Sequence, residues 1–198
     1  KDDASPLKMD SRSDELDELI LSVWPQDRLI RPDDVRGSHA TLREAIASDG
    51  WPTMRAGRDK AIFFYFDSDV YRDTYLDGHP NAEGRVMFPR SDKELDSPIG
   101  AFVNIDDPVD GAERILQFVQ AGFFVRTRTD SESYEAENED TSRMEAALAS
   151  AAQMLSTDWP VENEYYNYSF DIPDGSPSRC NPHIAPEGCS AQDVENLE

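Results

Sequence analysis

The chain has 198 residues, of which 41 are acidic and 19 are basic, so its formal net charge is −22. This charge excludes a nucleic-acid binder, because such proteins present a basic face to the phosphate backbone, and it disfavours adsorption to anionic lipid. A hydrophobic content of 38% predicts a folded core, and no apolar run reaches the roughly 18 residues of a membrane span.

The first third of the chain is predicted to be mainly helical. A helix begins at Ser13, because acidic residues in its first turn favour the helix N-terminus and apolar residues recur at helical spacing until Pro25. Residues 26–40 are rich in Asp, Arg and Gly and are predicted to be a loop. A second helix follows Thr41, which starts a capping-box pattern, and closes at Gly50.

Short apolar segments later in the chain are predicted to be β-strands. They occupy residues 60–66, 86–88, 100–103, 123–127 and 153–156. Helices are predicted between them: one over 70–76, one that opens at Asp107-Pro108 and ends at Gly122, and one that starts near Thr141. The acidic segment 132–140 lacks the spacing of an EF-hand and is predicted to be a solvated link. Strands that alternate with helices predict an α/β fold with a parallel sheet.

Charged residues follow several of these strands, at the position where α/β proteins place their chemistry. Asp67 follows the first strand, Arg126, Arg128 and Asp130 end the fourth, and Asp158 follows the fifth. The two arginines are two residues apart on a strand, so their side chains leave the same face, and they need an anionic neighbour. Either Asp130 or Asp158 pairs with them structurally, or at least one guanidinium binds a phosphate or a hydroxyl group.

The cysteines and histidines bear on compartment and chemistry. Cys180 and Cys189 lie in a proline-rich segment near the end of the chain, and we favour a disulfide between them over two free thiols. A disulfide indicates an oxidising compartment, so the protein is expected to be secreted, periplasmic or extracellular. The three histidines, His39, His79 and His183, all fall in predicted loops, and no catalytic residue can be identified among them.

An ordered series of motifs resembles one known family. The motifs are Arg31-Pro-Asp-Asp-Val-Arg-Gly37, Gly50-Trp-Pro-Thr53, Arg85-Val-Met-Phe88, Val125-Arg-Thr-Arg-Thr-Asp130, Ser156-Thr-Asp-Trp-Pro160 and Arg179-Cys-Asn-Pro182. Together they resemble the calcium-dependent phosphoinositide phospholipase C family of bacteria and fungi, a member of the phospholipase C-like phosphodiesterase superfamily of TIM barrels. The resemblance runs over about residues 14–189, and its Thr-Asp-x-Pro piece is similar to glycerophosphodiester phosphodiesterases too.

The resemblance implies a (β/α)8-type barrel, of which the chain holds about five strands. A TIM barrel needs eight strands and typically about 250 residues, so the N-terminal strands are expected upstream of residue 1. We therefore expect a partial barrel that forms a single domain over residues 1–189, with a frayed tail over 190–198. Lys1-Asp-Asp resembles the end of the Glu-x-Lys motif of the superfamily, which places Lys1 near the substrate phosphate.

The resemblance also implies the chemistry. The family cleaves a phosphodiester with two histidines, the inositol 2-hydroxyl as internal nucleophile, and calcium. The catalytic histidines and the main calcium ligands are expected upstream of residue 1, so the metal ligands in this chain are unknown and the isolated chain is expected to be inactive. Arg126 and Arg128 are the expected phosphate ligands, and Asp67, Asp130 and Asp158 the acidic residues at the barrel mouth.

The expected function is therefore that of the C-terminal part of a secreted, calcium-dependent phosphoric diester hydrolase of the phosphatidylinositol phospholipase C type. The alternatives are a glycerophosphodiester phosphodiesterase-like enzyme and a non-catalytic acidic binding module on the same scaffold. The expected partner is a phosphodiester or an inositol phospholipid. Transient contact with a membrane surface is disfavoured by the net charge of −22, and no obligate protein partner is expected.

Overall fold

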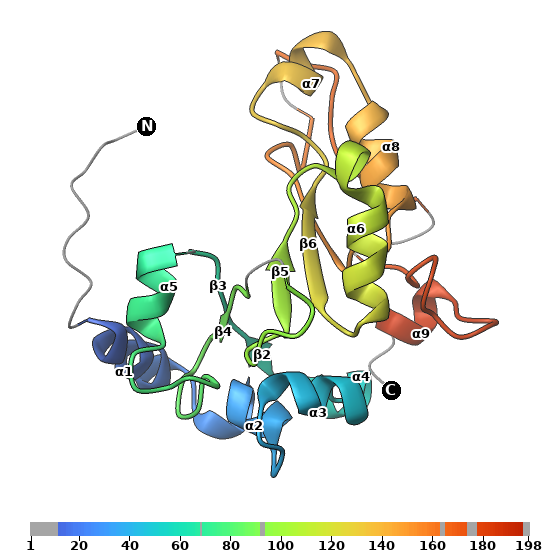
Figure 1. Cartoon of the computed structure of the whole chain (residues 1–198). Coiled ribbons are helices and arrows are strands. Elements are labelled where there is room, and N and C mark those ends of the chain that lie inside the picture. The colour runs from blue at the N-terminus through green and yellow to red at the C-terminus, as the bar shows by residue number, and fades with distance from the viewer. Residues whose placement is uncertain (1–11, 68, 92–93, 163–164, 174–177, 196–198) are drawn as a thin grey trace. The chain divides into compact units, whose positions relative to one another are not determined.

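The computed structural model of the chain describes residues 12–67, 69–91, 94–162, 165–173 and 178–195. It divides into two compact units, Lys1–Phe102 and Val103–Glu198. Each unit combines helices with short parallel strands (Figure 1). This confirms the predicted mixed α/β class.

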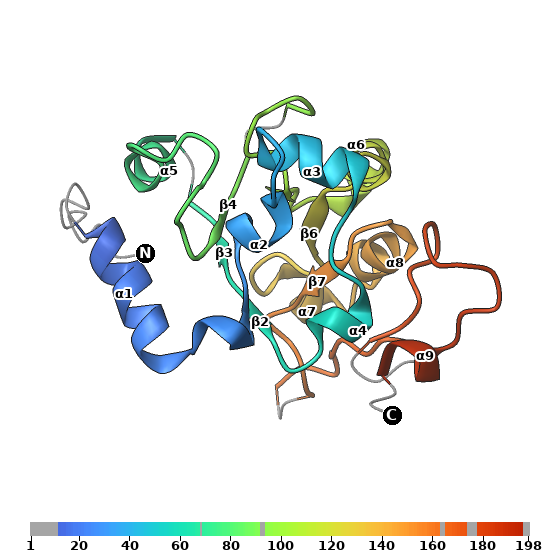
Figure 2. The same ribbon diagram turned by 90° about the horizontal axis from the view of Figure 1, so that it is seen from below.

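The first unit contains helices and two pairs of short parallel strands. Its helices are α1 (Ser13–Val23), the 3-10 turn η1 (Gln26–Arg28), α2 (Pro32–Arg36), α3 (Leu42–Ser48), α4 (Met54–Gly57) and α5 (Asp69–Tyr75). Its strands are β1 (Leu29–Ile30), β2 (Ala61–Ile62), β3 (Phe64–Tyr65) and β4 (Phe88–Pro89). Strand β1 pairs with β2, and β3 pairs with β4. Figure 2 shows this unit from a second side.

Two predictions for this unit are corrected. The segment 60–66 is two strands rather than one, because the chain leaves regular pairing at Phe63 and changes partner from β1 to β4. The predicted loop 26–40 contains η1, β1 and α2. Helix α2 has a proline at its N-terminus, and its Asp34 carboxylate accepts a hydrogen bond from the backbone N–H of Arg31, as in a capping box.

The second unit is built around one three-stranded sheet with strand order β5-β6-β7. Its strands are β5 (Phe102–Asn104), β6 (Phe124–Arg128) and β7 (Met154–Ser156), and its helices are α6 (Pro108–Gln120), α7 (Tyr134–Asn138), α8 (Ser142–Ala149) and α9 (Ala191–Glu195). Strands β6 and β7 run parallel, with Arg126 opposite Met154 and Arg128 opposite Ser156. Their C-terminal ends therefore lie at the same edge of the sheet.

Local sequence signals fix the ends of α6, as predicted. The Asp107 carboxylate accepts hydrogen bonds from the backbone N–H groups of Val109 and Asp110, and Pro108 occupies the first turn. Gly122 follows the helix with a φ of 86°, a left-handed conformation that glycine adopts without strain.

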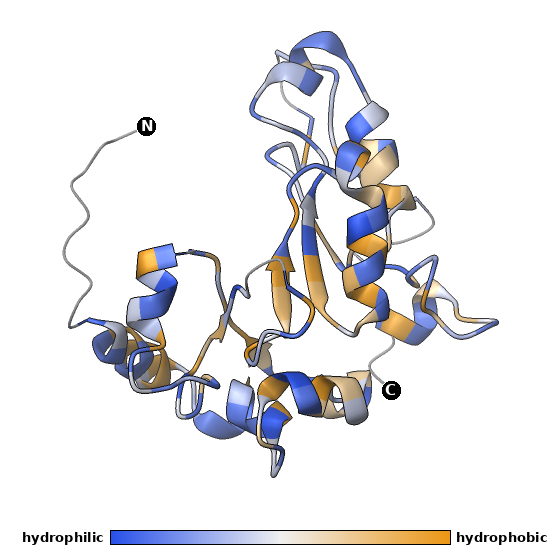
Figure 3. Ribbon diagram, viewed as in Figure 1, coloured by the Kyte–Doolittle hydropathy of each residue, from blue (hydrophilic) through white to orange (hydrophobic). Residues whose placement is uncertain are grey.

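The core of this unit lies between α6 and the sheet. Apolar residues in or next to β5, α6 and β6, and in the segment before β7, form one buried cluster: Val103, Ile105, Ile115, Phe118, Val119, Phe123, Val125, Ala151 and Ala152. Figure 3 shows that β6 passes from hydrophobic to hydrophilic along its length. The apolar start of β6 anchors the strand in the core, and its polar end is left to carry the site.

Helices also occur where the sequence suggested irregular chain. The acidic segment 132–140 contains α7, and Glu135 in it is buried rather than solvated, because Arg143 pairs with its carboxylate at 2.8 Å. Helix α9 lies within the segment 190–198 that was predicted to be a frayed tail. Within the described ranges, no helix combines the length and the apolar character that crossing a bilayer requires.

Candidate functional site

Strand β6 carries two arginines on one face. Val125 and Thr127 are buried, whereas Arg126 and Arg128 are partly exposed, so burial alternates along the strand. Both arginines lie in the second half of β6, toward the sheet edge that carries the strand C-termini. Parallel α/β proteins bind ligands at this edge.

Arg126 is held by the last residue of β5 and by a residue just after it. Its guanidinium contacts the Asp106 carboxylate and donates to the side-chain oxygen of Asn104 at 3.2 Å. Partial burial lowers the pKa of Arg126, and the negative charge of Asp106 opposes this shift. The guanidinium is nevertheless cationic, because arginine is not deprotonated in proteins.

Arg128 is held by the segment that follows β7. Its Nη2 lies 2.5 Å from Oδ2 of Asp158 and 3.9 Å from Oδ1 of Asp130. The Asp158 side chain is 57% exposed, so the pair faces solvent. The Nε of Arg128 is buried and has no hydrogen-bond partner among the described residues. The guanidinium therefore has one buried donor that makes no hydrogen bond to a described residue, which is uncommon in native proteins.

Asp130 is the buried centre of the site. Its side chain is fully buried, and its carboxylate accepts hydrogen bonds from the hydroxyls of Thr129 at 2.8 Å and Thr157 at 2.6 Å. It also accepts from the backbone N–H of Asp158 at 3.0 Å. Burial raises the pKa of Tyr168 to about 12, and the negative charge of Asp130 is the next contribution.

The structure thus brings together four of the predicted site residues: Arg126, Arg128, Asp130 and Asp158. It adds Asp106 and Asn104, which the sequence analysis did not assign. The signal that finds them is the one used for the other strands, namely polar residues directly after an apolar strand.

The other predicted site residues lie elsewhere. Asp67 follows β3 in the first unit, where it is exposed; burial raises the pKa of the nearby Tyr65, and the charge of Asp67 raises it further. Lys1 lies outside the described residues.

The three histidines have partners of their own. His39 bonds to Asp49 at 2.9 Å, His79 to the carbonyl oxygen of Glu83 at 2.6 Å, and His183 to the carbonyl oxygen of Ala149 at 2.9 Å. Ala149 ends α8, which returns the chain to the start of β7, so His183 lies toward the opposite end of the sheet from the arginines. No general acid–base histidine is thus placed at the arginine site within its unit.

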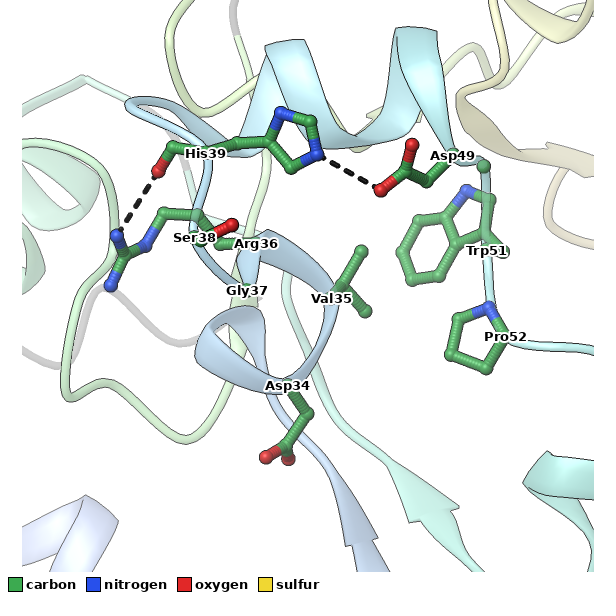
Figure 4. Close-up of a pocket in the computed structure, with 10 residues that line it drawn as sticks. Asp34, Val35, Arg36, Gly37, Ser38, His39, Asp49, Trp51 and Pro52 are labelled. Atoms are coloured by element: carbon green, nitrogen blue, oxygen red, sulfur yellow. Dashed lines mark hydrogen bonds and ion pairs between the residues drawn. The ribbon is translucent and has the colours of Figure 1, made fainter.

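His39 and Asp49 line a pocket of about 390 Å³ in the first unit (Figure 4). Trp51, Pro52 and Val35 form its apolar part. Asp49 has a lowered pKa, first because of the hydrogen bond with His39 and then because of the one from Ser48. This contact explains the position of His39 without a catalytic role.

The predicted disulfide is present. Cys180 and Cys189 are bonded, with 6.0 Å between their Cα atoms. The loop that they close reaches α8 and the turn after it: Asn181 donates to the carbonyl oxygen of Ala151 at 2.7 Å, and His183 meets that of Ala149. The disulfide loop therefore stabilises the end of α8 that leads into β7.

The residues do not by themselves form a calcium site. In the part of the chain that the structure describes, no group of three or more His, Cys, Asp or Glu side chains is placed to hold a metal ion. The exposed carboxylates at the site, Asp106 and Asp158, are each engaged by an arginine. Calcium prefers six to eight oxygen ligands, and these two residues do not provide such a set.

Comparisons with known proteins show the family to which the chain belongs. A family model described as "Phosphoinositide phospholipase C, Ca2+-dependent" matches residues 3–182, whereas no curated protein sequence matches. The fold is similar to that of a Ca2+-dependent phosphatidylinositol-specific phospholipase C from Streptomyces antibioticus, with a TM-score of 0.53 and 20% sequence identity over 73% of this chain. The match spans 57% of the length of that enzyme's chain. Because the family model matches most of its length, the chain belongs to the Ca2+-dependent phosphoinositide phospholipase C family.

Proposed function

We propose that the chain forms the C-terminal part of a calcium-dependent phosphoric diester hydrolase of the phosphatidylinositol phospholipase C type, in which Arg126 and Arg128 bind the phosphate of the substrate. The observation that carries the proposal is the pair of guanidiniums at the C-terminal edge of β6. Each is held by an exposed carboxylate, from Asp106 or Asp158, that a phosphate could replace. A planar guanidinium suits a phosphate because it offers paired donors to paired oxygens.

The proposal includes the architecture. We propose that the short parallel strands are the later strands of a TIM-type barrel and that residues 1–189 form one domain. The parallel pairing within β1-β2, β3-β4 and β6-β7 supports it, as does the order of the motifs along the chain. Lys1 is proposed to approach the same phosphate on the strength of its motif alone.

The chemical role of this part is to position and stabilise charge. Two fixed guanidiniums orient a phosphodiester and offset the negative charge that develops on its oxygens, and removing one such donor typically costs about 10²–10³ in rate. Proton transfer is not assigned to any residue described here, because no histidine lies at the arginines within their unit. No step is assigned to calcium either, because the described residues lack a suitable ligand set.

The proposed location is secreted, periplasmic or extracellular. The Cys180–Cys189 disulfide supports this, because such bonds persist in oxidising compartments. The substrate is proposed to be a phosphodiester or an inositol phospholipid. Contact with its membrane is expected to be transient, since a net charge of −22 opposes adsorption to anionic lipid.

A second candidate is a non-catalytic module that binds phosphate-bearing ligands. The placement of His183 away from the arginines favours it, since the arginine site has charge but no proton-transfer group from that residue. A glycerophosphodiester phosphodiesterase-like enzyme is the third candidate. The three differ in the ligand that they prefer and in turnover.

Binding to the purified chain tests the proposal. Isothermal titration calorimetry would compare myo-inositol 1-phosphate, glycerol 3-phosphate and inorganic phosphate on the wild type, Arg126→Ala and Arg128→Ala. We expect the inositol phosphate to bind most tightly and each substitution to weaken it. Preference for glycerol 3-phosphate would favour the glycerophosphodiester reading, and equal binding by wild type and both variants would overturn the phosphate site.

A further inference from the structure

The site holds two carboxylates with opposite properties around one guanidinium. Asp158 lies 2.5 Å from Nη2 of Arg128 and is 57% exposed, so it can turn into solvent when an anion arrives. Asp130 lies 3.9 Å from the same nitrogen and is fully buried. A buried carboxylate with three hydrogen bonds cannot move away, so the two residues cannot have the same role.

The contacts of Asp130 span two strands. Thr129 continues β6, the strand that carries Arg128, whereas Thr157 and Asp158 belong to the segment after β7. Thr157 in turn accepts a hydrogen bond from the backbone N–H of Trp159 at 2.8 Å. Through these bonds, one carboxylate sets the path of the Thr157-Asp158-Trp159 backbone relative to the end of β6.

We infer that Asp130 is a positioning residue of the anion site: its buried carboxylate holds the Arg128 guanidinium and the backbone at Asp158 in the arrangement that receives a phosphate. The inference rests on the proposed function, in which Arg128 binds that phosphate. Asp130 acts on Arg128 through charge, because 3.9 Å is longer than a hydrogen bond. It acts on Asp158 through the N–H bond of 3.0 Å.

The substitution Asp130→Asn distinguishes a positioning role from a purely electrostatic one. Asp130→Asn keeps the size and one acceptor oxygen but removes a negative charge beside Arg128. If Asp130 only lowers the positive potential of the site, the variant must bind phosphate more tightly, because the competing charge is gone. If Asp130 positions the site, the variant must bind more weakly in spite of the favourable change in charge. The two roles therefore predict opposite signs.

The experiment measures the affinity of the full chain for inorganic phosphate, by NMR titration of the arginine Nε–H signals. We expect Asp130→Asn to weaken binding roughly tenfold, since small displacements of binding groups cost that much or more. Asp158→Asn is the matched control: it removes an equal charge from the same guanidinium but keeps the backbone N–H bond to Asp130, so we expect it to tighten binding.

A second pair of variants leaves every charge in place. Thr157→Val removes the hydroxyl that donates a hydrogen bond to Asp130, at nearly constant volume, and should also weaken phosphate binding. Thr157→Ser keeps the hydroxyl and should restore the affinity. This pair decides the question should Asp130→Asn fail to fold.

The outcomes separate this inference from the proposed function. Unchanged or tighter binding by Asp130→Asn, or by Thr157→Val, would overturn the positioning role while the arginine site stands. Binding that survives in both Arg126→Ala and Arg128→Ala would overturn the proposed function, and the positioning role with it. Weaker binding by Asp130→Asn together with tighter binding by Asp158→Asn supports both.

Discussion

Arg128 and Asp158 meet across the ends of two neighbouring parallel strands, with 2.5 Å between Nη2 and Oδ2. The β6–β7 register sets this contact, because Arg128 lies directly opposite Ser156 and Asp158 follows two residues later. A structural ion pair of this kind is the alternative to phosphate binding that the sequence predicts for Arg128. The proposed function requires that a substrate phosphate can displace Asp158 from it.

Replacing Arg128 tests that requirement through the shape of the side chain. Arg128→Lys keeps the charge but loses the planar fork, and we expect the affinity for phosphate to fall by about 1.5–3 kcal/mol, the usual worth of a charged hydrogen bond. The melting temperature should hardly change, because an exposed ion pair contributes about 0–1 kcal/mol. Arg114→Lys, on the exposed face of α6, is the control and should change neither quantity. A large loss of stability without loss of phosphate binding would show that Arg128 is scaffold.

The isolated chain is expected to show no phosphodiesterase turnover. Acid–base groups each contribute on the order of 10²–10⁴ in rate, and His183 points its Nε2 to the carbonyl oxygen of Ala149 rather than toward the arginines. The measurement is an assay of the chain on phosphatidylinositol vesicles with and without calcium, beside a complete phospholipase C. Turnover comparable to that enzyme would contradict the expectation and would call for a proton-transfer group that we have not assigned.

Local signals in the sequence were sufficient to predict both ends of α6 and the start of α3. Asp107 caps α6 through two backbone N–H groups, Gly122 leaves it with a positive φ, and Thr41 caps α3 by accepting from the N–H of Glu44. Such contacts join residues two to four positions apart, so the amino-acid pattern alone contains them.

Strand boundaries were less predictable because they depend on distant partners. Leu29 and Ile30 become a strand by pairing with Ala61 and Ile62, more than thirty residues away. The apolar run 60–66 is interrupted at Phe63, where the partner changes. Nothing in the local hydrophobic pattern records either event.

The candidate site could be predicted only in part, because some of its contacts also depend on distant strand neighbours. The position of Arg126, Arg128 and Asp130 at one strand end follows from the strand itself, whereas the partnership of Arg126 with Asp106 depends on how β5 lies beside β6. Glu135 was predicted to be solvated because its segment is acidic, but its carboxylate is buried and contacts Arg143 and the backbone N–H of Ser131.

In the first unit, Tyr75 is expected to matter for stability through two hydrogen bonds. Its buried hydroxyl donates to Oδ1 of Asp17 at 2.7 Å and accepts from the N–H of Met87 at 3.0 Å. Tyr75→Phe leaves both buried partners short of a bond, so we expect a loss of about 1–3 kcal/mol in the free energy of unfolding. Urea titration measures it, with Tyr71→Phe as a control on the rim of the same cluster.

The loss should depend on pH. Burial raises the pKa of Asp17 above its usual 3.8, and the bond from Tyr75 holds that rise in check. An acid whose folded pKa is raised favours the fold below its unfolded pKa, and this advantage is lost as the pH rises through the folded value. The deficit of Tyr75→Phe should therefore be larger at pH 7 than at pH 3.5. A deficit that is constant with pH would show that Asp17 does not respond to Tyr75.

At the His39–Asp49 contact the carboxylate pKa is lowered, whereas that of Asp17 is raised. The hydrogen bond with His39 lowers the pKa of Asp49, so the contact stabilises the fold above the unfolded pKa of about 3.8 and is lost as the pH falls through the lower, folded value. In His39→Ala we expect the pKa of Asp49 to rise toward 3.8, as measured by ¹³C NMR of its carboxylate. Ser48→Ala should raise it less, because the bond from Ser48 is the smaller contribution. An unchanged pKa in His39→Ala would mean that the pair is not formed in solution.

Removal of the disulfide should loosen the end of α8 without unfolding the sheet. A loop as short as that between Cys180 and Cys189 contributes about 2–3 kcal/mol. The double substitution Cys180→Ser/Cys189→Ser should lower the free energy of unfolding by that amount. The same change frees the loop that brings Asn181 and His183 to the carbonyl oxygens of Ala151 and Ala149. We therefore expect faster amide hydrogen exchange in the last turn of α8 and at the start of β7.

Asn181→Ala is the matched control, because it keeps the disulfide and removes one of these donors. It should raise exchange at the end of α8 with a smaller loss of stability, of about 1 kcal/mol. Intact mass before and after reduction and alkylation establishes that the bond is formed in the starting material. If the double serine variant exchanges at the end of α8 like the wild type, the loop docks on its own. The disulfide then acts on the unfolded chain alone, by restricting its conformations, and has no part in holding α8 against β7.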